Sequence, residues 1–246
     1  MVKSVKKAID ILFYLSNDPE QPATLGTIAR ALDINQATCS HLLDTLCDSL
    51  MVEHVSRKEG YRLGPSAYLL TRYGRYQESL IEVCSPIIRW VRQQLNATVF
   101  LTVVCDGIKY IILNEEGNAS LDLRKSEIIK GSIETTASGL LMMAYMGKDA
   151  LYRVCRRSAD PEQFMKDTAG REASFSQIRK TGFVHLHDDE NLRHTFAFRI
   201  TDGIKTVASI GIVYPDTEDC PAVREKVIRT GRSAANEISR RLQFRS

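Results

Sequence analysis

Histidine and carboxylate side chains come together in the run His185-Leu186-His187-Asp188-Asp189. On a strand, residues 185 and 187 face the same side, and imidazole combined with carboxylate is ligand chemistry for zinc. His185, His187 and Asp188 are therefore candidates for a metal site. Two histidines at this spacing also occur by chance, and we favour the interpretation of a polar strand end that runs into an acidic turn.

The same residues could serve acid–base catalysis, with Cys105 or Ser138 as a nucleophile. The sequence contains no GxSxG, no P-loop and no GxGxxG motif before a helix to accompany them. We therefore expect no catalytic residues, no cofactor and no enzyme activity. A metal- or metabolite-binding protein, or a small-molecule enzyme that uses His185, His187 and Asp188, is kept as the alternative function.

A second polar run, residues 36–41, has the side chains that read base pairs. Cys39, Leu42 and Leu43 have the spacing of an inward-facing helical stripe, which leaves the polar residues on the outer side. Gln can pair with adenine, Ser, Thr and His can donate to bases or phosphates, and Ala can touch a thymine methyl. The DNA contacts predicted from this run are Gln36, Ala37, Thr38, Ser40 and His41.

The elements expected around this run are those of a winged helix-turn-helix. Thr24 is expected to cap a short helix over 25–32, and Asn35 to cap a third helix. Strands are expected at 52–56 and 60–63, joined by the hairpin tip Arg57-Lys58-Glu59. In this motif the second helix of the helix-turn-helix enters the major groove. The remaining predicted DNA contacts are Thr24, Arg57 and Lys58.

Composition limits the class of protein. The formal net charge of the 246 residues is only +3, so charge alone does not indicate a nucleic-acid-binding protein. No apolar run approaches the roughly 18 to 20 residues that span a bilayer, and no signal peptide is recognised. The six cysteines form no CxxC pair. We expect a cytoplasmic protein that does not contact membranes and whose cysteines are small buried side chains.

Beyond Gly64 the sequence contains both strand patterns and helical patterns. Strand patterns at 98–104, 109–113, 194–201 and 206–214 lie between helical patterns, which predicts an antiparallel sheet with helices on one face. The fold class predicted is α+β. The predicted domains are a winged helix-turn-helix over 1–64, a linker helix over 65–78 and an effector-binding α/β domain over 79–246.

Several of these segments resemble the IclR family of transcriptional regulators. The resemblance lies in residues 4–12, 27–32 and 38–46, in the wing-to-linker motif Tyr61-Arg62-Leu63-Gly64-Pro65, and in Thr136-Ala137-Ser138-Gly139. It extends over nearly the whole chain, although His41 stands where the family commonly has Arg. It implies a winged-helix DNA-binding domain, a linker helix and a GAF-like effector-binding domain. It also implies a homodimer or homotetramer on palindromic double-stranded operator DNA.

The resemblance further implies a small-molecule effector, with carboxylates and sugar acids among the candidates. Independently of it, a loop of small residues that leads into a helix offers N–H groups to an anion. Arg199 could clamp an acidic ligand, or it could be a solvated residue at the sheet edge. We therefore predict a ligand-responsive repressor of a catabolic or metabolic operon. The predicted effector-binding residues are Thr136, Ala137, Ser138, Gly139, Asp188, Thr195 and Arg199.

Overall fold

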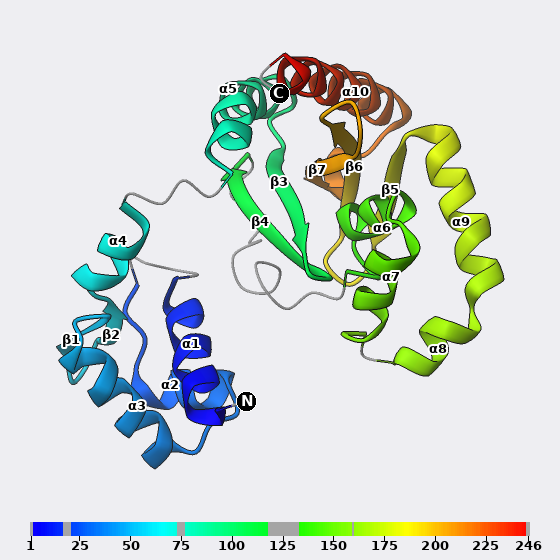
Figure 1. The fold of residues 1–246 in the computed structure, drawn as a ribbon. Coiled ribbons are helices and arrows are strands. Elements are labelled where there is room, and N and C mark those ends of the chain that lie inside the picture. The colour runs from blue at the N-terminus through cyan, green and yellow to red at the C-terminus, as the bar shows by residue number, and fades with distance from the viewer. Residues whose placement is uncertain (1, 17–20, 73–76, 118–132, 159, 245–246) are drawn as a thin grey trace. The chain divides into compact units, whose positions relative to one another are not determined.

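The computed structural model describes residues 2–16, 21–72, 77–117, 133–158 and 160–244, in two compact units, Met1–Tyr76 and Gln77–Ser246 (Figure 1). Part of the expected linker helix, residues 73–76, lies outside the described residues. The first unit contains a three-helix bundle, a two-stranded hairpin and a further helix. Its elements are α1 (Lys3–Ser16), α2 (Leu25–Ala31), α3 (Gln36–Asp48), β1 (Val52–Ser56), β2 (Gly60–Leu63) and α4 (Pro65–Arg72).

The caps and the core of the first unit follow from its sequence. Thr24 Oγ1 accepts a hydrogen bond from the N–H of Thr27 at 3.3 Å, and Asn35 Oδ1 accepts one from the N–H of Ala37 at 2.9 Å. Each cap satisfies a backbone donor that the helix itself cannot use. The apolar stripes of the three helices then meet in one core around Ile11, Ile28 and Leu43, all fully buried. The bundle therefore holds the start of α3 at the surface.

The hairpin is tied to the segment before α2. Ala23 and Tyr61 exchange two backbone hydrogen bonds, of 2.8 and 2.9 Å, so the segment before α2 pairs with β2. Gly60 makes this close approach possible. Its φ is +97°, and a Cβ at this position would lie 2.3 Å from the carbonyl oxygen of Ala23. The hairpin tip, residues 57–59, projects from this anchored base.

Gly60→Ala is therefore expected to destabilise the first unit strongly. The alanine would adopt an unfavourable backbone conformation and its methyl group would collide with backbone, so we expect the free energy of unfolding to fall by at least about 2 kcal/mol. Chemical denaturation followed by circular dichroism measures the change. Gly26→Ala is the matched control, because its nearest neighbour would be 4.0 Å away. An equal loss in both variants would contradict the argument.

The second unit is built on a five-stranded antiparallel sheet with strand order β4-β3-β7-β6-β5. Its strands are β3 (Thr98–Cys105), β4 (Ile108–Glu115), β5 (Phe183–Asp188), β6 (Arg193–Thr201) and β7 (Thr206–Pro215). Its helices are α5 (Glu78–Leu95), α6 (Ala137–Ala144), α7 (Lys148–Cys155), α8 (Pro161–Lys166), α9 (Thr168–Thr181) and α10 (Pro221–Gln243), with a 3-10 turn, η1 (Asp216–Glu218), after β7.

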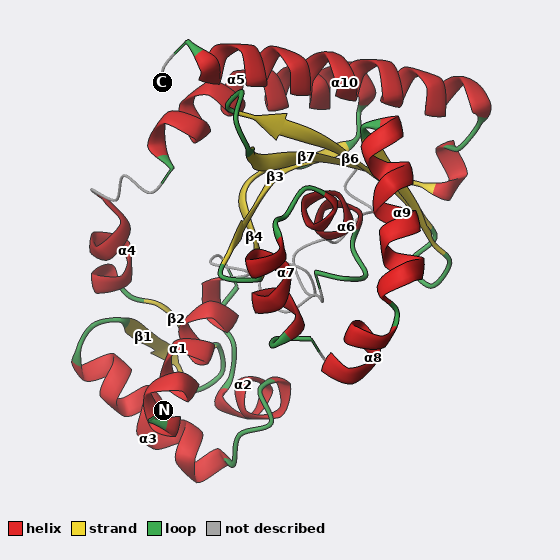
Figure 2. Cartoon of the chain, turned by 45° about the vertical axis from the view of Figure 1, so that its right-hand side comes forward, coloured by secondary structure: helices red, strands yellow, loops and turns green. Residues whose placement is uncertain are grey.

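Helices cover both faces of this sheet. Helices α5 and α10 pack on one face and α6 on the other (Figure 2). The expectation of helices on one face was therefore wrong. The physical reason lies in β6, where Phe196 and Phe198 are buried towards α5 and α10 while Ala197 between them is buried against Ala137 and Leu141 of α6. A strand that is buried on both sides requires a cover on each.

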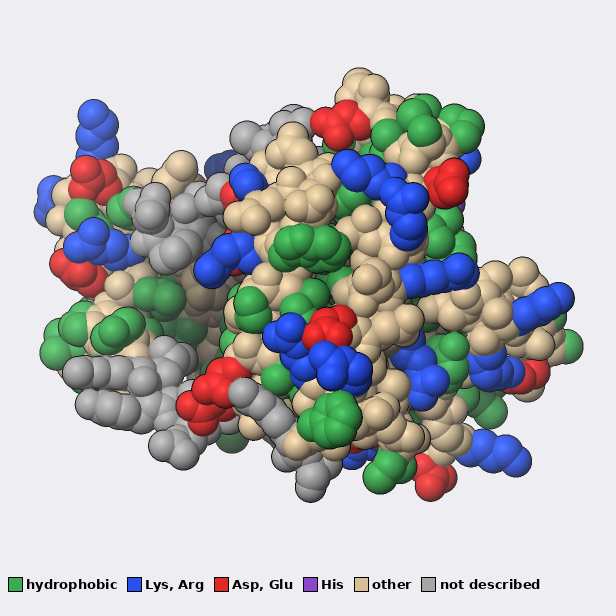
Figure 3. All heavy atoms as spheres, turned by 90° about the horizontal axis from the view of Figure 1, so that it is seen from above, with side chains coloured by type: hydrophobic (Ala, Val, Ile, Leu, Met, Phe, Trp, Pro, Cys, Tyr) green, Lys and Arg blue, Asp and Glu red, His purple; other side chains and the backbone are tan. Residues whose placement is uncertain are grey.

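The solvent side of this covering layer is charged. Helix α10 is amphipathic. Residues such as Val227 and Ile238 are buried on its inner face, and exposed Lys and Arg residues lie on its outer face. Figure 3 shows Lys and Arg side chains over this side of the molecule, interspersed with acidic groups. Among the described residues no helix is both long and apolar enough to cross a membrane. All six cysteines are free thiols. The expectation that they are buried is wrong for Cys105 and Cys220, which are exposed.

Candidate functional site

The outer face at the start of α3 carries the predicted base-reading residues. Cys39 and Leu43 are fully buried on the inner side. Ser40 is half-buried and can present its hydroxyl only at the edge of this face. The inward packing therefore leaves an exposed polar surface at the end of the helix that can enter a major groove. Its exposed members are Gln36, Ala37, Thr38 and His41.

The other predicted DNA contacts lie at two separate places. Arg57 and Lys58 are exposed at the hairpin tip, whose turn is closed by the N–H of Glu59 donating to Ser56 Oγ at 3.1 Å. An exposed basic tip of this kind suits contacts to backbone phosphates. Thr24 is exposed, but its hydroxyl oxygen is engaged in capping α2. Its role in the structure is therefore first that of a cap.

A cavity of about 310 Å³ lies between α6 and the sheet of the second unit. Its wall contains Thr136, Ala137 and Ser138 from the start of α6, together with Asp188 and Thr195 from the sheet. The structure thus brings five of the seven predicted effector residues into one pocket. The other residues of the wall are Phe100, Lys109, Thr135, Leu186, His187, Asp189, Glu190 and Arg193.

The start of α6 gives the pocket hydrogen-bond donors. Thr136 caps the helix, and its Oγ1 accepts from the N–H of Gly139 at 3.2 Å. Gly139 does not line the cavity; a Cβ there would lie 1.8 Å from the carbonyl oxygen of Ile133, so glycine is needed for packing. The N–H groups of Ala137 and Ser138 precede the first intrahelical bonds and can bind a ligand. Ser138 is 2% exposed, and its hydroxyl has no hydrogen-bond partner among the described residues.

Two cations complete the polar wall. Lys109 of β4 is 4% exposed. Arg193 of β6 donates from Nε to Asp188 Oδ2 at 3.0 Å, and a second guanidinium nitrogen lies 2.9 Å from the same oxygen. Burial raises the pKa of Asp188, but hydrogen bonds from Asn191 and Arg193 outweigh it and hold that pKa below its usual range. The Asp188 carboxylate is therefore ionised and fixes Arg193 at the pocket wall.

Arg199 does not lie at this pocket. Its Nε donates to Thr206 Oγ1 at 2.7 Å, and its guanidinium carbon lies 4.2 Å from the centre of the Tyr145 ring. Arg199 shares the sheet face of Arg193 and Thr195, but it lies further along β6. The hypothesis that it clamps the ligand is not supported by this placement.

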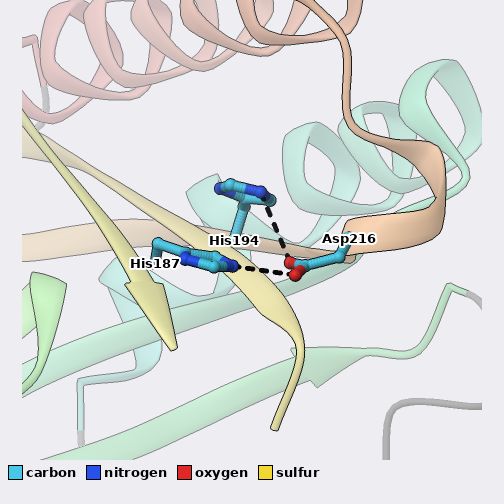
Figure 4. A group of neighbouring side chains, drawn as sticks. All are labelled: His187, His194 and Asp216. Atoms are coloured by element: carbon cyan, nitrogen blue, oxygen red, sulfur yellow. Dashed lines mark hydrogen bonds and ion pairs between the residues drawn. The ribbon is translucent and has the colours of Figure 1, made fainter. Parts of the chain in front are cut away.

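The predicted metal candidates do not come together as a set. His185 and His187 lie on the sheet face opposite to Asp188, because neighbouring residues of a strand point to opposite faces. Instead His187 Nε2 lies 2.8 Å from Asp216 Oδ2, and His194 Nε2 lies 3.4 Å from Asp216 Oδ1 (Figure 4). His185 joins this group through His194, with 2.9 Å between His185 Nε2 and His194 Nδ1.

The pKa values of the three histidines in this cluster are shifted in different directions. The hydrogen bond to Asp216 raises the pKa of His187, whereas burial lowers the pKa of both His185 and His194. Asp219 lies 3.5 Å from His194 Nε2 through Oδ2, and hydrogen bonding from Arg224 lowers the pKa of Asp219 to about 2. Asp219 is thus held as an anion by Arg224.

No family model matches the sequence. Among curated proteins the chain is similar to the HTH-type transcriptional regulator TtgV of Pseudomonas putida, with 22% identity over 223 residues, which cover 88% of this chain and 83% of TtgV. Among solved structures it is similar to an IclR homolog from Microbacterium hydrocarbonoxydans complexed with 4-hydroxybenzoate, at a TM-score of 0.69 and 17% identity, over 98% of this chain and 99% of that one. The Thermotoga maritima IclR superposes at a TM-score of 0.65 with 19% identity, over 98% and 99%.

The chain has the fold of the IclR-type regulators. The predicted α+β fold class, with a winged helix-turn-helix followed by an α/β domain, is confirmed.

Within this IclR-type fold, sequence reasoning missed the two cations of the pocket. A signal for Arg193 existed, since it lies two residues before Thr195 and therefore on the same face of β6. Lys109 carried no such signal, because its strand reaches the pocket only through the pairing of β3 with β7. His194 and Asp216 were missed as partners of His187 for a similar reason: they become neighbours only when β5 and β7 flank β6.

Proposed function

We propose that this chain is a ligand-responsive, sequence-specific DNA-binding transcriptional regulator, and that it represses a catabolic or metabolic operon. The observation that carries the proposal is the combination of two features in one chain. One unit exposes the polar start of α3 on a winged helix-turn-helix, and the other encloses a polar pocket. The similarity to TtgV and to IclR-type structures, whose names are those of regulators, supports a regulator over an enzyme.

The pocket supports a small anionic effector. Lys109, Arg193 and the start of α6 supply cationic or N–H donor groups, while the exposed Asp189 and Glu190 lie at the rim. The carboxylate of a ligand would bind the cationic and N–H donor groups, and hydroxyl groups on the same ligand would donate to the acidic side chains at the rim. This favours a hydroxylated carboxylic acid or a sugar acid. The volume of about 310 Å³ suits a metabolite of this size. The structural relative complexed with 4-hydroxybenzoate binds a molecule of this class.

An exposed apolar stripe on α1 supports self-association. Val5, Ile9 and Phe13 follow one another at helical spacing and are all exposed. A homodimer or homotetramer that covers such a stripe would present pairs of recognition helices to a palindromic operator. Effector binding would then favour one arrangement of the helices over another, with a coupling of about 1 to 3 kcal/mol.

Selection of bound duplexes from a random DNA pool, with purified protein at stated salt, tests the proposal. Enrichment of a palindromic motif is expected, and repetition with a panel of small carboxylates should identify one that changes the affinity for that duplex. If folded protein enriches no motif, the proposal that the chain is a sequence-specific DNA-binding regulator is overturned. Enrichment that no ligand changes would overturn the sensing part only.

Ser138→Ala is expected to separate ligand binding from folding. Its buried hydroxyl has no partner among the described residues, so its removal should leave the free energy of unfolding unchanged or raise it slightly. A ligand that accepts a hydrogen bond from it should bind about tenfold more weakly. Calorimetric titration and chemical denaturation on the same samples measure both quantities. Unchanged affinity would remove Ser138 from the binding site.

A further inference from the structure

The histidine cluster on the α10 side of the sheet has the geometry of a metal site. It is formed by the end of β5, the start of β6 and the turn η1 after β7 (Figure 4). One ligand atom from each of His187, His194 and Asp216 lies within 4.8 Å of the other two. Three donors bonded to one tetrahedral ion at about 2.0 to 2.1 Å would be roughly 3.3 Å apart. The cluster therefore needs only small side-chain movements to surround an ion.

Both imidazole rings are oriented by a second partner. His187 Nδ1 lies 3.0 Å from Asp189 Oδ1, so that its Nε2 points at Asp216. His194 Nδ1 lies 2.9 Å from His185 Nε2. With the shared proton on His194 Nδ1, its Nε2 lone pair also faces Asp216. Partners on the far ring nitrogen are the usual means by which proteins orient metal-binding histidines.

We propose that His187, His194 and Asp216 form a binding site for a divalent transition-metal ion, with Zn²⁺ as the natural occupant. Two imidazole nitrogens and one carboxylate are a ligand set that zinc accepts, with water in the fourth position. The ligand atoms lie on the sheet face opposite to α6, although His187 also contributes to the wall of the ligand pocket at this end of the sheet. The metal site does not depend on the regulator function.

The surroundings favour an ion at this position. Asp216 Oδ1 is buried and has no hydrogen-bond partner among the described residues, so a cation would satisfy it. The His187 side chain is 38% exposed, which leaves a path from solvent. Asp219 is neutralised by its ion pair with Arg224, and we assign it the role of an outer anion rather than a ligand.

Binding would link elements that are distant in sequence. The ion would join the β5–β6 hairpin end to the turn that leads into α10. His187 and Asp189 also contribute to the wall of the ligand pocket. A bound ion would therefore stiffen one side of that pocket.

Titration of the full-length protein with Co²⁺, a spectroscopic substitute for Zn²⁺, tests the site. The protein is prepared without a polyhistidine tag, stripped with a chelator that is then removed, and carries Cys105→Ser and Cys220→Ser to exclude its exposed thiols. We expect the visible absorption of four-coordinate Co²⁺ to appear at one equivalent and to be displaced by Zn²⁺. Zn²⁺ is also expected to raise the melting temperature.

Variants locate the ion. His187→Gln and Asp216→Asn should each raise the Co²⁺ dissociation constant by at least about tenfold. Asp216→Asn keeps the size and an acceptor oxygen, which guards against loss through misfolding. The matched control is His41→Gln, an exposed histidine of the first unit, which should bind Co²⁺ normally. Absence of the absorption band, or a band that both ligand variants retain, would overturn the site and leave a hydrogen-bonded histidine network.

Discussion

Thr38→Glu is expected to lower the affinity for the selected operator by at least about 100-fold. Thr38 is exposed at the start of α3, one turn before His41 on the same side of the helix. A carboxylate there would replace a base contact, which is worth about 1 to 3 kcal/mol. It would also be repelled by the phosphates that line the major groove. The substitution lies on the solvent side, so the core around Leu43 is unaffected.

The control is Thr45→Glu, two turns further along the same helix. Thr45 is also exposed, but it lies beside Asp44 and Asp48, two carboxylates that a DNA-contacting surface would not tolerate. We expect its affinity to stay within about threefold of that of the parent protein. Fluorescence anisotropy with the selected duplex, at one stated salt concentration, measures both variants. If both lose affinity equally, or if neither does, α3 does not dock by its first two turns.

The first unit could be predicted closely because its signals are local. The caps Thr24 and Asn35 and the bounds of β1 and β2 follow from residue types within a few positions of one another. The end of α2 shows the limit of such signals, because the helix expected over 25–32 ends at Ala31. Helix ends fray, so a sequence determines a terminal residue only to within one or two positions.

The pocket and the histidine cluster were less predictable because they are made by pairing across the sheet. Strand alternation alone separates Asp188 from His185 and His187, and that inference was available from the sequence. That Asp216 meets His187 requires the order β7-β6-β5, and that Lys109 lines the same cavity as Arg193 requires β3 to pair with β7. The spacing of these residues in the sequence does not predict that either pair comes together. Arg199 shows the converse case, since it shares the sheet face of Thr195 but lies further along β6 and does not line this cavity.

The second large effect is expected at Lys109, which supplies a buried cation to the pocket wall. Lys109→Met keeps the length of the side chain and removes the ammonium group, so the pocket loses its charge without a cavity being created. We expect the carboxylate identified in the ligand panel to bind about 100-fold more weakly, because a hydrogen bond to a charged group contributes about 1.5 to 3 kcal/mol. Calorimetric titration measures the loss, and operator binding without ligand should persist.

The comparison that makes this result specific is Lys205→Met. Lys205 is exposed in the turn between β6 and β7, so its removal changes the net charge of the unit equally without touching the pocket. A loss confined to Lys109→Met would assign the effect to direct contact with the ligand. An equal loss in both would assign it to long-range attraction, which added salt weakens. Full affinity in Lys109→Met would mean that the ligand is uncharged or binds elsewhere, because a buried ammonium beside a bound carboxylate cannot be without effect on its affinity.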